Sequence, residues 1–257
     1  MLSIKNIGRI SKRYRHLRRY QQILGIIIKY GFENIIEAMN IDHYIESGLQ
    51  LIPFVKAHEK VERLSKNQRI RLTLEELGPT FVKMGQVLSS RPDLVPPDLL
   101  IELTKLQDHV PSFSSEEVRA IIASEFGKPI NTLFETIEHS PFASASIGQV
   151  HKAKLYNGDE VAVKVQRPGI RKTVEADLEI MLHIASIIEK NIVEVAFFRP
   201  VKIVEEFAKT LEKEMDYTIE ASSMTRMAGH FKKDPAIKIP EVYPDYSSER
   251  VLTMEFI

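Results

Sequence analysis

In this 257-residue sequence, the residue whose neighbours most strongly suggest chemistry is Lys164, which lies in a segment of alternating apolar and polar residues. Residues 160–166 read Glu-Val-Ala-Val-Lys-Val-Gln, which is the two-residue period of a β-strand. The three valines point to one face, whereas Ala162, Lys164 and Gln166 point to the other. This second face suits a nucleotide, because alanine leaves room for a base and lysine reaches phosphate. A solvated strand lysine is the commoner case, so the segment needs support from its context.

That context is an alanine-rich segment that precedes the lysine strand. Val-Ala-Val-Lys resembles the V-A-I-K strand of protein kinases, and residues 143–150 stand where kinases carry a glycine-rich phosphate loop. Alanine occupies the first two glycine positions, and its methyl group restricts positive φ, so we expect the loop to close over phosphates differently. A plain Ala/Ser turn is the alternative. The candidate nucleotide contacts are Ala143, Ser144, Ala145, Ser146, Ile147, Gly148, Val150, Ala162 and Lys164.

The alanine substitutions point to one family. The run Phe-Ala-Ser-Ala-Ser-Ile-Gly-Gln-Val-His at residues 142–151 resembles the alanine-rich loop of the UbiB/ADCK family of atypical kinase-like proteins, which is associated with ubiquinone biosynthesis. The family's KxGQ motif is matched by Lys83-Met84-Gly85-Gln86. Residues 88–93 and 106–108 are also similar to family sequence. The resemblance extends from about residue 70 to the last residue.

The resemblance implies an α+β fold: a protein-kinase-like N-lobe of antiparallel sheet and helices, preceded by an all-helical KxGQ extension, with the C-lobe absent. We expect three regions, namely a basic helical region at 1–65, the helical extension at 66–135 and the N-lobe at 136–257, ending at the hinge. The sequence contains no catalytic-loop or D-F-G run. We therefore expect a fragment of an ATPase of the phosphoryl-transfer type. It would bind ATP or ADP weakly without turnover, would use Mg²⁺ only if a C-lobe were supplied, and has no metal site of its own.

A cleft-lining lysine needs a carboxylate partner, as in the kinase lysine–glutamate pair. Residues 201–230 read as one helix with an apolar stripe that Glu214 borders, so we predict that Glu214 pairs with Lys164 as the catalytic pair. Glu214-Met215-Asp216 also matches the family's ExD motif. Solvated helix charges are the alternative. The resemblance implies that the KxGQ face covers the nucleotide cleft, with Asp216 tying the lobe to it. The regulatory set is Lys83, Gly85, Gln86, Asp216 and Glu220.

On a helix beginning at Pro79, Phe81, Met84 and Leu88 form an apolar stripe, and the KxGQ lysine and glutamine lie on the other side. Two solvated polar residues are the alternative there. At the carboxyl end, residues 251–257 resemble the strand that leads into the kinase hinge, where the backbone near Glu255 and Phe256 would meet adenine.

The elements that must position these residues change character near residue 140. Apolar residues before it recur at helical spacing, with Ser114 or Ser115 able to cap a helix. After it, runs at 147–156 and 160–166 flank Asn-Gly-Asp, a strong hairpin signal. We predict helices at about 173–190 and 201–230, then strands at 237–242 and 250–257.

Composition restricts the remaining classes of function. Lys+Arg and Asp+Glu both total 35 and cysteine is absent, which excludes thiolate chemistry. Residues 1–32 are basic without an acidic residue, so this opening either lies on an anionic membrane surface or packs on the domain as a solvated helix. No apolar run reaches the roughly 20 residues of a membrane span. We expect a cytoplasmic protein, peripheral at the membrane, whose partners are nucleotide, isoprenoid lipid and quinone-biosynthesis enzymes rather than nucleic acid. The alternative function is a non-catalytic regulatory or membrane-surface binding module.

Overall fold

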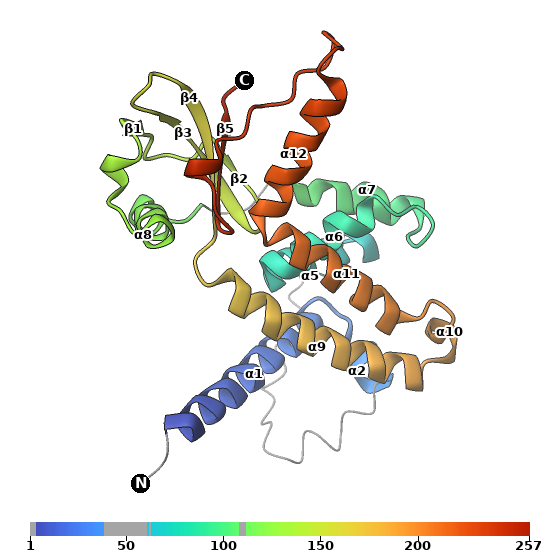
Figure 1. Ribbon diagram of the computed structural model, residues 1–257. Coiled ribbons are helices and arrows are strands. Elements are labelled where there is room, and N and C mark those ends of the chain that lie inside the picture. Colours follow the sequence, from blue (N-terminus) through green and yellow to red (C-terminus); the bar gives the residue numbers. More distant parts are fainter. Residues whose placement is uncertain (1–3, 39–60, 62, 108–111) are drawn as a thin grey trace. The chain divides into compact units, whose positions relative to one another are not determined.

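The computed structural model describes residues 4–38, 61, 63–107 and 112–257 (Figure 1). These residues fall into two compact units, neither of which is one continuous segment. The helical unit comprises residues 1–108 and 172–208, and the sheet unit comprises residues 109–171 and 209–257. Of the region predicted at 1–65, residues 1–3, 39–60 and 62 lie outside the described residues.

Among its described residues, the helical unit contains helices and no strand. Its elements are α1 (Ile4–Lys29), α2 (Glu33–Ala38), α5 (Lys66–Leu77), α6 (Pro79–Ser89), α7 (Pro97–Thr104), the 3₁₀ turn η1 (Lys105–Gln107), nearly all of α9 (Ile170–Asn191), α10 (Val193–Ala196) and the first part of α11 (Pro200–Glu214). Among the described residues, no helix has both the length and the apolar character that a membrane span requires.

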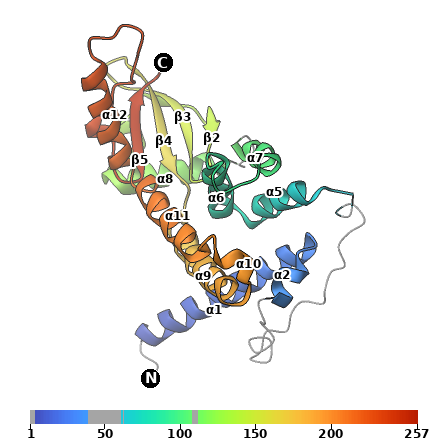
Figure 2. The same cartoon turned by 90° about the vertical axis from the view of Figure 1, so that its right-hand side faces the viewer.

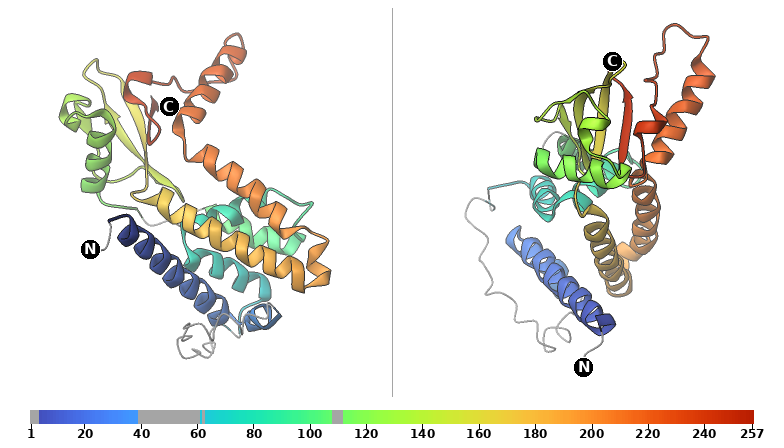
Figure 3. Two further views of the ribbon diagram at one scale, coloured as in Figure 1. Left: turned by 60° about the horizontal axis from the view of Figure 1, so that its bottom comes forward. Right: turned by 60° about the vertical axis from the view of Figure 1, so that its left-hand side comes forward.

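Helix α1 packs on the helical unit through its second half. Leu24 is buried against Tyr20 and the isoleucines of α9. Figure 3 shows helix α1 alongside α9. Arg19 donates from Nε to Oδ1 of the fully buried Asp177 at 2.6 Å and from Nη2 to the carbonyl oxygen of Leu77 at 2.6 Å. Lys29 forms an ion pair with Glu76 at 2.7 Å. Two of the basic residues of the opening therefore have partners within the unit, as the packed-helix alternative predicts.

The sheet unit contains a five-stranded antiparallel sheet. Its strands are β1 (Thr136–Ile137), β2 (Ala143–Ser144), β3 (Gly148–Lys154), β4 (Glu160–Gln166) and β5 (Val251–Glu255). The order is β1-β3-β4-β5, with β2 also pairing with β3 (Figure 2). The predicted hairpin is confirmed, because β3 and β4 pair from Gly148 with Gln166 to Lys154 with Glu160. The turn needs Gly158, whose φ is 95°, a value that glycine adopts without strain.

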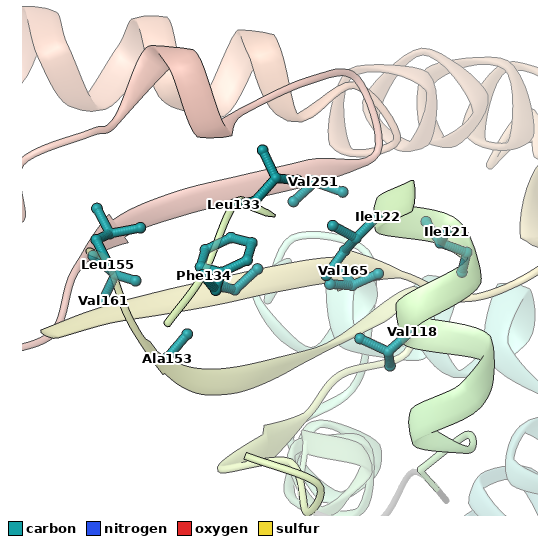
Figure 4. Packing of buried hydrophobic residues seen from close by; sticks show 11 residues of the cluster. Val118, Ile121, Ile122, Leu133, Phe134, Ala153, Leu155, Val161, Val165 and Val251 are labelled. Atoms are coloured by element: carbon teal, nitrogen blue, oxygen red, sulfur yellow. The ribbon is translucent and has the colours of Figure 1, made fainter. Parts of the chain in front are cut away.

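The core of the sheet unit lies between one face of the sheet and α8 (Ser115–Phe126). As predicted, the β4 valines share this face, and Val118, Ile121 and Ile122 of α8 cover them (Figure 4). Ser114 is the cap: its hydroxyl accepts from the backbone N–H of Glu117, whose side chain returns a bond to the cap. This capping box starts α8 at the position where its apolar stripe meets the valines.

Two predicted elements differ in the structure. The helix predicted at 201–230 is two helices, α11 and α12 (Tyr217–Phe231), separated by Met215 and Asp216. The strand predicted at 237–242 is absent from the described residues, where only an isolated bridge joins Val242 to Met254. Pro240 lacks the N–H that a strand ladder uses, which explains the loss of regular pairing. The 3₁₀ turns η2 (Ile130–Thr132) and η3 (Pro244–Tyr246) complete the unit.

Candidate nucleotide site

The second face of the sheet carries the candidate site, and the predicted alternation positions it. Lys164 lies in the middle strand, opposite Val150 of β3 and Leu252 of β5. Ala162, one pleat away, lies opposite Met254 and is 7% exposed. An alanine and a lysine therefore share a face, on which the neighbouring strands add Val150, Leu252, Met254 and a second lysine, Lys152, which lies opposite Ala162 and pairs with Glu160. The predicted placement of Ala162 and Lys164 on one face is confirmed, and their contact with a base and a phosphate stays a prediction.

The Lys164 ammonium is held by a carboxylate from α12. Its Nζ lies 2.7 Å from Oε2 and 2.9 Å from Oε1 of Glu220, so both carboxylate oxygens accept from it. The lysine side chain is 20% exposed and the glutamate side chain 39% exposed. The pair is partly desolvated, which holds the ammonium on the sheet face while leaving it within reach of an anion.

Sequence reasoning chose the wrong partner for this lysine. It assigned the role to Glu214, whereas the ion pair of Lys164 is made by Glu220, which had been placed in the regulatory set. The error follows from treating residues 201–230 as one helix. Glu214 is the last residue of α11, and the new helix that starts at Tyr217 brings Glu220 over the sheet at the end of its first turn.

Asp216 starts that new helix. Its Oδ1 accepts from the backbone N–H of Thr218 at 2.9 Å and from the Thr218 hydroxyl at 2.6 Å. This is an N-cap, which satisfies donors that the first turn of α12 would otherwise leave unpaired. The predicted tie from Asp216 to the KxGQ helix joins two different units and stays a prediction.

Gln166 is a residue that sequence reasoning did not include in the site. It is 1% exposed, and its Nε2 donates to the carbonyl oxygen of Met215, which the end of α11 leaves unpaired. The backbone N–H of Tyr217 donates to the carbonyl oxygen of Glu249 at 3.0 Å. The strand that carries Lys164 therefore also fixes the point at which α12 begins. The signal was present, because Gln166 shares the pleat face of Ala162 and Lys164.

The alanine-rich loop begins in β2 and ends at Gly148 on β3. Ala143 and Ala145 are exposed, whereas Ser146, Ile147 and Gly148 are buried. The backbone N–H of Ala145 donates to the carbonyl oxygen of Gly148 at 2.8 Å, which closes the loop on itself. The loop therefore presents its two alanines outward and anchors its last three residues.

Gly148 tolerates no side chain. A Cβ at this position would lie 2.6 Å from the carbonyl oxygen of Val165 and 2.5 Å from the hydroxyl of Tyr217. The backbone of β3 thus approaches β4 and α12 as closely as a glycine allows. This close approach is the structural use of the one glycine that the loop keeps.

Gln149 and His151 alternate with the site residues and point to the other face of the sheet. Both are buried. Gln149 accepts from the backbone N–H of Phe113 at 2.9 Å, and its amide lies 2.9 Å from His151 Nε2. His151 Nδ1 lies 2.8 Å from the carbonyl oxygen of Glu138, which makes Nδ1 the protonated nitrogen and Nε2 an acceptor. Burial lowers the pKa of His151, so the ring is neutral in this network.

The carboxyl end of β5, which was predicted to lead into a hinge, bonds to the segment at residues 238–241. Glu255 accepts from Lys238 at 2.7 Å and from the backbone N–H of Glu241 at 3.2 Å, and these bonds lower the pKa of its carboxyl. The backbone N–H groups of Glu255 and Phe256 donate to the carbonyl oxygens of Glu241 and Glu160. These two donors are engaged within the chain, so the predicted contact of this backbone with adenine could not use them as they stand.

The KxGQ residues lie on helix α6 of the helical unit (Figure 1). The predicted start at Pro79 is confirmed, but the buried side differs from the predicted stripe: Phe81 and Val82 are buried, whereas Met84 and Leu88 are only half-buried. Gly85 is the reason, because a Cβ there would lie 2.2 Å from Leu106, so the helix packs on its glycine side.

The KxGQ glutamine belongs to the same packing. Gln86 Nε2 donates to the carbonyl oxygen of Leu106 at 3.0 Å, which links α6 to η1. Lys83 is half-buried. Cover of the nucleotide cleft by this face would involve both units and stays a prediction.

Comparison with known proteins identifies the class. The ABC1 atypical kinase-like domain matches residues 105–257, which include the whole sheet, the Lys164–Glu220 pair and the loop. The chain belongs to this atypical kinase-like family. The expected mixture of helices and antiparallel sheet is confirmed.

Relatives named "Probable protein kinase UbiB" come from several bacteria. The one from Marinobacter nauticus is 45% identical over 94% of this chain and 44% of its own length. Those from Cellvibrio japonicus and Sodalis glossinidius are 39% and 38% identical over 93% and 95% of this chain. The chain spans less than half the length of these relatives, 42% and 44% for the last two.

A solved structure, "The complex structure of Rv3197-erythromycin from Mycobacterium tuberculosis", is 31% identical over 72% of this chain and 46% of its own, with a TM-score of 0.48.

Proposed function

We propose that the chain binds a nucleotide on the face of its sheet opposite α8, as the amino-terminal part of a UbiB-type atypical kinase-like ATPase. The observation that carries the proposal is the ion pair between Lys164 and Glu220 on the face that also bears Ala162. A lysine held by a glutamate presents its ammonium at a fixed point, which is what recognition of a phosphate requires.

The residues of this chain fit ATP or ADP. Ala162 and Met254, which lie opposite each other on β4 and β5, offer a small apolar surface for a base, and Lys164 offers a cation one pleat further along the sheet. The segment 143–148 precedes β3 and ends at Gly148. Because Gly148 has no side chain, the backbone of β3 can approach both β4 and α12 closely there. A bound nucleotide supplies the phosphoryl group for transfer or hydrolysis. The residues of this chain would bind and orient it.

Nucleotide titration of the 257-residue chain tests the proposal. Isothermal calorimetry with ATP and with ADP should give saturable binding that Lys164→Met weakens at least about ten-fold, since a charge-assisted bond to phosphate is lost. Lys154→Met is the matched control, because Lys154 is also a strand lysine paired with a glutamate, Glu135, at 2.8 Å. Binding that is unchanged by Lys164→Met, or absent from the wild-type chain, would contradict the proposal.

For the cell, we propose a role in ubiquinone or isoprenoid-lipid metabolism, supported by the family and by the UbiB name of the relatives. Cells that lack the gene should lose quinone, and wild-type protein should restore it where the Lys164→Met variant does not. Normal quinone content in the deletion strain would refute this role and leave the nucleotide proposal intact.

A further inference from the structure

Tyr217, the first residue of α12, lies next to both Lys164 and Gly148, the last residue of the alanine-rich loop. Its side chain is fully buried, and Lys164 Nζ lies 4.7 Å from the centre of its ring. The ring therefore supports the ammonium from beneath, through a cation–π contact that partial desolvation strengthens. None of the expectations drawn from the sequence involved this tyrosine.

The Tyr217 hydroxyl makes no hydrogen bond to any of the described residues, although it is buried. Buried polar atoms are nearly always paired, so an unpaired one calls for an explanation. The hydroxyl lies against the end of the alanine-rich loop, because a Cβ on Gly148 would be only 2.5 Å away from it. Burial, with the charges of Glu220 and Glu214, raises the pKa of Tyr217, so the group is a donor at neutral pH.

The two sides of this hydroxyl define the chemistry of its missing partner. An ammonium lies above the ring, and the loop segment that ends at Gly148 lies beside the oxygen. A donor beside a cation favours an anionic acceptor, since both groups then act on the same negative oxygen. Neighbouring carboxylates do not fill this role, as Glu220 is already engaged by Lys164.

We propose that the Tyr217 hydroxyl is a phosphate-binding donor of the nucleotide site and bonds a phosphate oxygen that Lys164 also holds. The proposal rests on the nucleotide-binding function proposed above and adds a residue to it. Because the hydroxyl is covered, the contact requires a local rearrangement around it when the nucleotide binds. Arrival of phosphate and exposure of the hydroxyl are then one event.

Removal of this single oxygen gives opposite effects on stability and on binding. Without nucleotide, Tyr217→Phe removes an unpaired buried donor, so the melting temperature should stay the same or rise. With nucleotide, the variant lacks a bond to a charged acceptor, so affinity for ATP should fall about ten-fold, or roughly 1.4 kcal/mol. A purely structural tyrosine would move both quantities in the same direction or neither.

The experiment measures melting temperature without ligand and dissociation constants for ATP, ADP and adenosine on the 257-residue chain. Tyr156→Phe is the control, since Tyr156 is an exposed tyrosine whose hydroxyl donates to the carbonyl oxygen of Asn131. The loss should appear with ATP and ADP, whereas adenosine, which has no phosphate, should bind wild type and variant alike.

Three results would overturn the inference. ATP affinity of Tyr217→Phe within about two-fold of wild type would mean that only the ring matters. A melting temperature several degrees lower would mean that the hydroxyl already has a partner. A wild-type chain that binds no nucleotide would refute both the proposed function and the role of Tyr217. Weak binding by Lys164→Met together with normal binding by Tyr217→Phe would refute only the role of Tyr217.

Discussion

Replacement of Gly148 by alanine tests whether the loop, β4 and α12 meet as closely as the structure indicates. The added Cβ would lie 2.6 Å from the carbonyl oxygen of Val165, against an ordinary contact distance of at least 3.4 Å, so the overlap is 3.4 − 2.6 = 0.8 Å. That oxygen belongs to the backbone of the middle strand and cannot rotate away. The Tyr217 hydroxyl, 2.5 Å away, is at the end of a fully buried ring.

The sign follows from two opposing magnitudes. Overpacking of a well-packed core costs about 1–3 kcal/mol. A glycine-to-alanine change returns about 0.4–1 kcal/mol by restricting the unfolded chain. The net expectation is destabilisation of about 1–2 kcal/mol, which for a protein of this size lowers the melting temperature by roughly 2–8 °C.

Gly229→Ala is the matched control, because it makes the same chemical change in the same unit. Gly229 lies in α12 at a position where an added Cβ would meet nothing within 4 Å, so alanine should stabilise the helix by about 0.5 kcal/mol. Thermal unfolding followed by circular dichroism compares the two variants with wild type. A Gly148→Ala protein that melts at or above the wild-type temperature would refute the close approach.

Three further predictions concern the supports of the site and of the helical unit. Asp216→Ala should lower stability by about 1 kcal/mol in urea unfolding, because α12 loses its cap, whereas Asp216→Asn should stay within a few tenths of wild type. Burial lowers the folded-state pKa of His151 below its unfolded value of about 6.5, so the folded protein should be fully stable above that pH and less stable as pH falls below it. The His151→Gln variant should show a smaller fall in melting temperature at low pH. The control His230→Gln, at an exposed position of α12, should show the same fall as wild type. Asp177→Ala should lower the free energy of unfolding by about 3 kcal/mol, because Arg19 loses its buried partner. The double variant Arg19→Met/Asp177→Leu should recover part of that stability in thermal unfolding. Additive losses of stability would contradict the pairing.

The parts of the fold that sequence predicted are those with local causes. The β3–β4 hairpin follows from two alternating runs and a turn that contains Gly158, all within about 20 residues. The cap of α8 at Ser114 is equally local, since the serine and Glu117 are three residues apart. The face that carries Lys164 was therefore accessible from the sequence alone.

The parts that were missed depend on contacts between distant segments. Gln166 reaches the carbonyl oxygen of Met215, 49 residues further along the chain. Tyr217 meets Gly148 across a longer separation, 217 − 148 = 69 residues, and the periodicity of either segment does not indicate that contact. The loss of the strand at 237–242 is different, because Pro240 was a readable signal against regular pairing.

The break between α11 and α12 decides which glutamate serves the lysine. On one continuous helix, at about 100° per residue, Glu214 and Glu220 would be six residues and about 120° apart around the helix axis, so at most one could face the sheet. The apolar stripe of α11 then favours Glu214, which is the choice that the sequence pattern produced. Asp216 caps a new helix, so Glu214 and Glu220 no longer lie on one continuous helix. Gln166, on the strand that carries Lys164, donates to the carbonyl oxygen of Met215 at the end of α11. The ion pair thus depends on a cap and an amide that do not take part in it, so substitutions at Asp216 should alter the position of Glu220 without touching either charge.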